Sequence, residues 1–346
     1  MGKYSVGLDA PGVAPIRVGP HALRSAVLLA PMSGVTDLPF RRLANRLGAG
    51  LVVAEMVASE HLVHDRHGAR RRIRGRGLDP FVIQLAGCEA RWMAEGARIA
   101  QAAGADIIDI NMGCPAREVT GKLSGSALMR DLDHAVDLIE AVVRAATVPV
   151  TLKMRLGWDE GSRNAPELAR RAEAAGIALI TVHARTRCQF FNGAPDWAFV
   201  RHVTGAVRIP VVVNGDIVDP ASARAALATS GAAGVMVGRG ACGAPWMPAR
   251  IAAALGAGPG GRDPGPPPLP EQCSIAIGHV EAMVELDGPN VGLRNARKHI
   301  GWYLASSGRP AETVKAWRRR LCTSEDVGEV RAGLGEFYTQ AMEAAA

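Results

Sequence analysis

The chain has 346 residues, of which 48% are hydrophobic and 21% are charged, as is typical of a folded globular protein with a large core. Residues 1–20 contain no apolar segment of the secretory type, and no apolar run approaches the roughly 20 residues of a membrane span. We therefore expect a monomeric cytoplasmic protein that makes no membrane contact and has one large and one small domain.

Cysteine spacing and charge add two constraints. The six cysteines form no CxxC pair, so we expect neither a zinc site nor any other metal site. The net charge is +7, and residues 66–77 alone hold six arginines and no acidic residue. On charge alone, a solvated surface and a polyanion-binding surface remain equally compatible with this cluster.

Short apolar runs alternate with helical patterns over the first 250 residues. The predicted strands are 27–32, 51–56, 81–86, 106–112, 148–154, 178–184, 209–215 and 234–238, and examples of the predicted helices are 37–48, 89–104, 133–146, 165–176 and 220–231. The runs are continuously apolar, which indicates parallel strands covered on both faces. This pattern predicts an α/β fold, a (β/α)8 TIM barrel. A doubly wound sheet is the alternative, but the first strand-to-helix turn lacks a G-x-G-x-x-G sequence.

The chain outside the barrel strands divides into three parts. Residues 16–27 predict a short hairpin that closes the bottom of the barrel. We assign residues 1–250 to the barrel domain and 251–270 to a Gly/Pro-rich linker. Residues 271–346 show only helical patterns, so they predict a small all-helical C-terminal domain.

Candidate ligand-binding residues gather at the ends of the predicted strands, at the edge where such barrels hold their active sites. They are Pro31, Met32 and Ser33 at the end of the first strand, Gln84 on the third, Asn111 and Cys114 at the end of the fourth, Lys153 on the fifth, His183 at the end of the sixth, Asn214, Gly215 and Asp216 at the end of the seventh, and Gly238 and Arg239 at the end of the eighth. Each has a plain structural explanation by itself, such as a core histidine or a buried thiol. Together at one edge they predict a ligand site.

The last two strand ends indicate the kind of ligand. Glycine-rich turns after strands seven and eight are where such barrels bind phosphate, and Arg239 adds a forked donor. Lys153 and Gln84 can meet a flat heterocycle, and a positive charge there favours a reduced flavin. We infer that the ligand is FMN.

Ten ordered motifs then resemble the bacterial tRNA-dihydrouridine synthase family, especially its B-type branch. They are APMSGVTD (30–37), AEM (54–56), IQLAG (83–87), DINMGCPA (109–116), GKLSGSALM (121–129), VTLKMRLGW (150–158), HARTRCQFFNG (183–193), VVNGDI (212–217), VGRGACGAPW (237–246) and RNARKHIGWYL (294–304). The resemblance covers nearly the whole chain after residue 16. It departs from the commonest pattern at Ser33, where alanine is frequent, and in the extension before residue 16.

The resemblance implies an activity and a set of site residues. Family members reduce the C5=C6 bond of uridines in the D-loop of tRNA, with FMN as cofactor and NADPH as reductant. It implies FMN contacts from Pro31, Met32, Ser33, Gln84, Lys153, His183, Asn214, Gly215, Asp216, Gly238 and Arg239, with Asn111 near the flavin or the target base. Cys114 is implied as the proton donor to C5, because a thiol of pKa about 8.5 stays protonated at neutral pH.

The tRNA has to be gripped while its uridine is extruded, at a cost of a few kcal/mol. We expect Lys122, Arg294, Arg297, Lys298 and the arginines of residues 70–76 to contact it, mainly at phosphates. Two alternatives stay open at this point. One is a flavin barrel enzyme for a small molecule, such as a dihydroorotate dehydrogenase, and the other is a tRNA-binding protein without catalysis.

Overall fold

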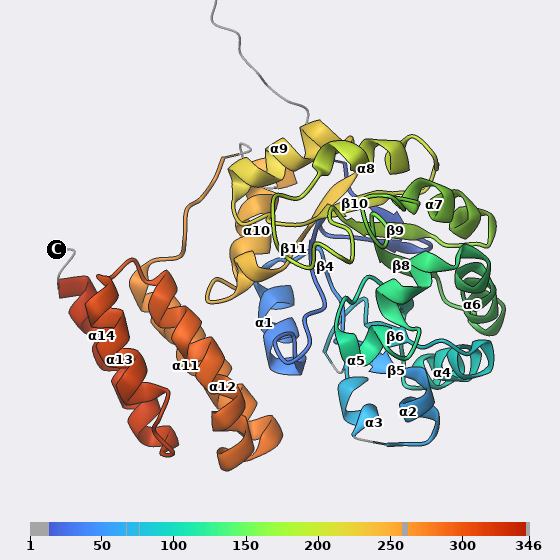
Figure 1. Ribbon diagram of the computed structural model, residues 1–346. Coiled ribbons are helices and arrows are strands. Elements are labelled where there is room, and N and C mark those ends of the chain that lie inside the picture. The colour runs from blue at the N-terminus through green and yellow to red at the C-terminus, as the bar shows by residue number, and fades with distance from the viewer. Residues whose placement is uncertain (1–13, 67, 76, 258–261, 344–346) are drawn as a thin grey trace, which may run out of the picture.

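The structure is a computed structural model that describes residues 14–66, 68–75, 77–257 and 262–343. Figure 1 shows two parts, a curled sheet surrounded by helices and a separate group of C-terminal helices beside it. No helix within the described ranges is long and apolar enough to cross a membrane.

The described strands of the barrel form one parallel sheet. They are β3 (Val27–Leu29), β4 (Leu51–Val52), β5 (Val57–Ala58), β6 (Val82–Ala86), β7 (Ile107–Met112), β8 (Val150–Arg155), β9 (Leu179–His183), β10 (Val211–Asn214) and β11 (Gly234–Val237). Their order is β4-β3-β11-β10-β9-β8-β7-β6-β5. A bridge from Val53 to Val82 joins the β4 segment to β6, which closes the ring. The predicted barrel is therefore confirmed.

The second predicted strand, 51–56, differs from the prediction. It is split into β4 and β5, which pair with different neighbours, β3 and β6 respectively. The two pieces are separated by residues 53–56, of which Val53 makes a single bridge to Val82 and residues 54–56 belong to no strand. Glu55 and Met56 in this gap are only half-buried, so they need no place in the packed sheet.

Helices follow the strands and cover the outside of the sheet (Figure 1). They are α1 (Leu38–Leu47), α2 (Ser59–Val63), α3 (Ala69–Arg72), α4 (Ala90–Ala102), α5 (Arg117–Thr120), α6 (Leu132–Ala145), α7 (Ala165–Ala174), α8 (Trp197–Thr204), α9 (Pro220–Ser230) and α10 (Met247–Ala252), with short helices η1 (Gly125–Arg130), η2 (Arg239–Ala241) and η3 (Ala253–Ala257).

Local sequence fixes where several of these helices begin and end. Asp37 caps α1, because its Oδ1 accepts the N–H of Phe40 at 3.0 Å, and Gly48 ends the helix with a φ of 114°. Asp219 and Ser222 form a reciprocal capping box at the start of α9.

The predicted hairpin is present as β1 (Arg17–Val18) and β2 (His21–Ala22), which pair antiparallel. Ile16, Val18 and Leu23 pack into a cluster with the lower barrel interior, which includes Leu28 and Met236. The hairpin thus closes the barrel at the end opposite to the polar strand ends.

The C-terminal region consists of α11 (Leu269–Asp287), α12 (Pro289–Ser306), α13 (Ala311–Leu321) and α14 (Val327–Glu343). Gly292 allows α12 to approach α11 closely, since a Cβ on it would lie 2.5 Å from the carbonyl oxygen of Met283. Phe40 of α1 packs against His279 of α11 and His299 of α12, with ring centroids 5.5 and 5.4 Å apart. This contact joins the helical region to the barrel.

Candidate active site

A cavity of about 1030 Å³ opens at the carboxyl ends of the barrel strands. Every residue predicted for catalysis or cofactor binding lines it, namely Pro31, Met32, Ser33, Gln84, Asn111, Cys114, Lys153, His183, Asn214, Gly215, Asp216, Gly238 and Arg239. The barrel geometry thus brings residues from seven predicted strand ends to one place. Their individual roles stay predictions.

The wall from β6 to β8 is held by a buried hydrogen-bond network. The register sets Gln84, Asp109 and Thr151 side by side on adjacent strands. Asp109 is 4% exposed and accepts hydrogen bonds from Gln84 Nε2 and Thr151 Oγ1, both at 2.6 Å. Burial raises the pKa of this carboxyl, while the two hydrogen bonds act in the opposite direction. Asp109 fixes the orientation of the Gln84 amide, a role that the sequence analysis missed.

The network continues to Cys114 through Asn111. The Asn111 Nδ2 donates to Gln84 Oε1 at 2.8 Å, so its Oδ1 faces the backbone of the next loop. That oxygen accepts the N–H of Gly113 at 3.1 Å and of Cys114 at 2.9 Å. Asn111 therefore sets the place where the thiol enters the cavity.

The loop after Cys114 folds back on the same residue. The Cys114 carbonyl accepts both the N–H of Ser126, at 3.0 Å, and its Oγ, at 2.8 Å. Gly125 has a φ of 60°, and a Cβ there would lie 2.9 Å from the same carbonyl oxygen. Only glycine fits this position, and the half-buried Cys114 is held from both sides.

Lys153 brings a positive charge into the cavity, and its ammonium group has few hydrogen-bond partners. Its Nζ lies 3.5 Å from Asn214 Oδ1, a long contact. Burial, and then the nearby Arg155, lower the pKa of Lys153 to about 8, while Asp109 and Cys114 act in the opposite direction. The ammonium is thus charged at neutral pH but incompletely compensated, which suits a ligand with acceptor atoms.

His183 ends β9, the strand paired with β8, and is 8% exposed among cations. Burial first, and then Arg155, Lys153, Arg185 and Arg239, lower its pKa well below the usual value, so the imidazole is neutral. A neutral ring offers one donor and one acceptor to a ligand.

Two buried arginines, Arg155 and Arg185, shape this wall, and the sequence analysis assigned neither a role. Arg155 donates to the carbonyl oxygens of Gly113, at 2.8 Å, and Phe190, at 2.7 Å. Arg185 donates to Gly193 at 2.6 Å and to the Asp216 carboxylate. The signal was present, since each follows directly after an apolar strand, where a charged residue needs a buried partner.

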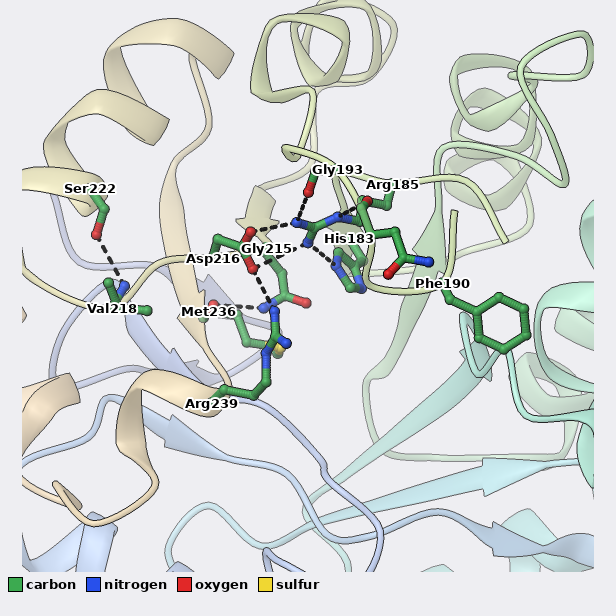
Figure 2. A network of polar contacts seen from close by, with 12 residues as sticks. His183, Arg185, Phe190, Gly193, Gly215, Asp216, Val218, Ser222, Met236 and Arg239 are labelled. Carbon is green, nitrogen blue, oxygen red and sulfur yellow. Dashed lines mark hydrogen bonds and ion pairs between the residues drawn. The ribbon is translucent and has the colours of Figure 1, made fainter. Parts of the chain in front are cut away.

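Figure 2 shows Arg185 lying between His183 and Asp216, with Arg239 on the other side of Asp216. Arg239 donates to Asp216 Oδ1 at 2.7 Å, and its side chain is largely exposed. The hydrogen bond from Arg185 is the main cause that lowers the pKa of Asp216, with a smaller contribution from Arg239. The carboxylate therefore orders two forked donors at one end of the cavity.

Backbone donors gather at the same end. The N–H groups of Gly215, Asp216 and Arg239 donate no hydrogen bond to another described residue. With the guanidinium of Arg239 they form a set of donors that suits a phosphate. Among the residues that the structure describes, no group of three or more His, Cys, Asp or Glu side chains is placed to hold a metal ion.

The residues predicted to contact tRNA are more widely spread. Lys122 is exposed on the loop after Cys114, and Arg294 is exposed on α12. Arg297 is half-buried and donates to the Ser324 carbonyl at 3.3 Å, so part of its fork serves the helical domain. The Lys298 ammonium lies over the first barrel loop, 3.7 Å from where a Cβ on Gly34 would be.

Comparison with known proteins gives related sequences over almost the whole length. The sequence model described as dihydrouridine synthase matches residues 28–344. A probable tRNA-dihydrouridine synthase of Rhodobacter capsulatus is 57% identical over 295 residues, which cover 84% of this chain and 90% of the relative. The tRNA-dihydrouridine synthase B of Pseudomonas putida is 43% identical over 326 residues, 94% of this chain and 95% of the relative.

Solved structures show the fold alone. Histamine dehydrogenase from Rhizobium sp. 4-9 aligns with a TM-score of 0.55 at 16% identity, over 95% of this chain and 64% of that one. An amine oxidase for 6-hydroxypseudooxynicotine from Pseudomonas geniculata N1 aligns with a TM-score of 0.54 at 15% identity, over 79% of this chain and 52% of that one.

Proposed function

Because the chain belongs to the dihydrouridine synthase family, we propose that it reduces the C5=C6 bond of uridines in tRNA, with FMN as cofactor and NADPH as reductant. The observation that carries the proposal is the placement of Cys114. The backbone of Cys114 is held by hydrogen bonds with Asn111 and Ser126, and Cys114 lines a cavity that Lys153 and His183 also line. The arrangement supplies an acid and a binding site for a flat, electron-accepting ligand together. The family membership favours this reading over the two alternatives left open above.

The residues of the cavity fit FMN by the chemistry of their donors. Asn214, Lys153 and the amides of Gln84 and Asn111 would meet the heterocycle, while Gly215, Gly238 and Arg239 would hold the phosphate. Pro31, Met32 and Ser33 would lie against the ring from the first strand end. FMN, when bound and reduced by NADPH, supplies the hydride that C6 of uracil receives.

Cys114 supplies the proton in this scheme. When C6 of uracil gains a hydride, the electron pair of the C5=C6 bond is left toward C5, which takes the proton from Cys114 Sγ. The sulfur keeps its electron pair as a thiolate and regains a proton from water. Asn111 acts as a positioning residue, since it fixes the backbone N–H of Cys114.

Lys153 and His183 provide the electrostatics. Lys153 adds a positive charge, which favours a ligand that gains negative charge on reduction. His183 is kept neutral by its buried surroundings, so it donates or accepts a hydrogen bond without adding a second charge. Lys122, Arg294 and the partly free fork of Arg297 would grip the tRNA backbone, with Lys298 close to the cavity.

The test uses an unmodified tRNA transcript with the purified protein, FMN and NADPH under low oxygen. We expect the mass of a D-loop fragment to rise by two hydrogens. Cys114→Ala should keep bound FMN and tRNA affinity but lose about 10²–10⁴-fold in turnover, because only proton delivery is removed. Cys242→Ala, a half-buried cysteine outside the cavity, is the matched control. The absence of dihydrouridine on both transcript and hypomodified cellular tRNA would contradict the proposal.

A further inference from the structure

A second cavity, of about 340 Å³, lies between the barrel loops and the helical domain. Arg72 lines both this cavity and the active site, so the two are neighbours along one groove. Gly34 and Glu55 face the second cavity, while the adjacent residues Ser33 and Met56 face the first. At the low end of the roughly 300–1,000 Å³ of small-molecule sites, the second cavity has room for about one nucleotide.

The charged side chains of this cavity are incompletely paired. Within the described chain, Glu55, Lys298, Arg72 and Arg74 make no side-chain hydrogen bond or ion pair. By contrast, Arg71 is paired with Asp287 across the two domains. Charges that face a cavity without partners are what a polar ligand would satisfy.

Arg41 gives an independent indication of a ligand. Its residue is only 2% exposed, and it donates from Nε to the Thr36 carbonyl at 3.2 Å and from Nη2 to the Arg74 carbonyl at 3.0 Å. Its Nη1 has no partner among the described residues, although the side chain lines the cavity. A buried guanidinium N–H without an acceptor is costly, so an acceptor from a ligand would stabilise it.

Acceptors stand next to these donors. Asp37 uses Oδ1 to cap α1, which leaves its second carboxylate oxygen able to accept a hydrogen bond from a ligand. Glu55 lies close enough to affect the pKa of Asp37. Burial, and to a lesser extent Glu55, raise the pKa of Asp37 to about 6, while the Phe40 hydrogen bond acts in the opposite direction. The wall therefore combines carboxylate acceptors with the donors Arg41 and Lys298.

This mixed wall discriminates among the four bases. A carboxylate accepts two adjacent donors, and guanine alone presents two, N1–H and N2–H₂, beside an acceptor, O6. Uracil offers one donor between two acceptors, and adenine and cytosine each offer one amino group. Unpaired bases are the ones whose edges proteins read in RNA.

We propose that this cavity holds an unpaired guanosine of the same tRNA, with Glu55 accepting from N1–H and N2–H₂ while Arg41 or Lys298 donates to O6. Arg72 and Arg74 at the rim would contact its phosphate. The inference rests on the proposed function, because the tRNA that brings a uridine to Cys114 brings this second nucleotide alongside. It makes Glu55 a residue for recognition of the tRNA, away from the reacting atoms.

The test replaces each guanosine near the target uridine, one at a time, by inosine, which lacks the N2 amino group. We expect one replacement to lower kcat/KM of the wild-type protein about tenfold. Glu55→Gln should lower kcat/KM on the unaltered tRNA by a similar factor. In this variant, the same inosine replacement should lower kcat/KM further by less than about twofold. Glu140→Gln, an exposed residue of α6 paired with Arg144, is the control and should behave as wild type.

Bound FMN measured by absorbance shows whether each variant is folded. If Glu55→Gln loses FMN, Glu55→Asp takes its place, because it keeps the negative charge on a shorter side chain. The inosine replacement that lowers kcat/KM of the wild-type protein should then have little effect on the Glu55→Asp variant. The inference would be overturned if the effects of the Glu55 substitution and of the inosine replacement on kcat/KM were independent at every guanosine. It would also be overturned if no inosine replacement lowered kcat/KM of the wild-type protein. Since wild-type dihydrouridine formation is measured in the same assay, its absence would contradict the proposed function instead.

Discussion

Replacement of Asp109 by alanine tests the network that links the barrel wall to Cys114. The change removes the acceptor of two buried donors, Gln84 Nε2 and Thr151 Oγ1, each 2.6 Å away. A buried donor without an acceptor costs about 1–3 kcal/mol, so the free energy of unfolding should fall by about 2–6 kcal/mol. Asp109→Asn keeps one acceptor and leaves one buried donor unpaired, so its loss should be about half as large, about 1–3 kcal/mol.

Catalysis should respond through Asn111. Without Asp109 the Gln84 amide is free to turn, and Gln84 Oε1 no longer holds the Asn111 side chain that fixes the Cys114 N–H. We expect kcat for dihydrouridine formation to fall more than tenfold while the affinity for tRNA is unchanged.

Urea unfolding followed by circular dichroism measures the stability, and single-turnover assays measure the chemistry. Thr151→Val is the control, because valine has nearly the same shape as threonine. It removes only the hydroxyl and leaves the contact between Asp109 and Gln84 in place. Equal stability of the alanine and asparagine variants, or an unchanged kcat in the alanine variant, would refute the reasoning.

Three further predictions use other parts of the molecule. Affinity for FMN, measured by quenching of its fluorescence, should fall as the pH rises through about 8, where Lys153 loses its proton, and Lys153→Met should remove this dependence. Burial, then His279 and Lys298, lower the pKa of His299 to about 2. The neutral, buried imidazole therefore contributes fully to stability above the unfolded-state pKa of about 6.5, and this contribution is lost as the pH falls below about 6.5. Thermal unfolding of His299→Phe should thus be less sensitive to acid, by up to about 1.4 kcal/mol per pH unit, and an unchanged slope would contradict this. Arg72→Gln should weaken tRNA binding about tenfold and lower the salt slope by about one in filter-binding assays, whereas the exposed Arg98→Gln should leave both unchanged.

The sequence by itself determined the barrel and the edge at which the cavity lies. Continuous apolar runs can be satisfied only by strands that are covered on both faces, and parallel strands place all their carboxyl ends at one edge. Residues near the carboxyl ends of those runs, such as Cys114, Lys153 and Asn214, therefore had to meet, whatever their separation along the chain.

Only the tertiary structure decided which side chains touch. The register sets Asp109 between Gln84 and Thr151, and curvature of the ring brings Arg185 to Asp216, contacts that join residues 25 to 42 positions apart. The cavity beneath Lys298 depends on how α11 and α12 dock on α1, through the contact of Phe40 with two histidines. Periodicity reports which face of an element is buried, but it carries no information about the partner that buries it, because that choice is made by packing between elements distant in the sequence.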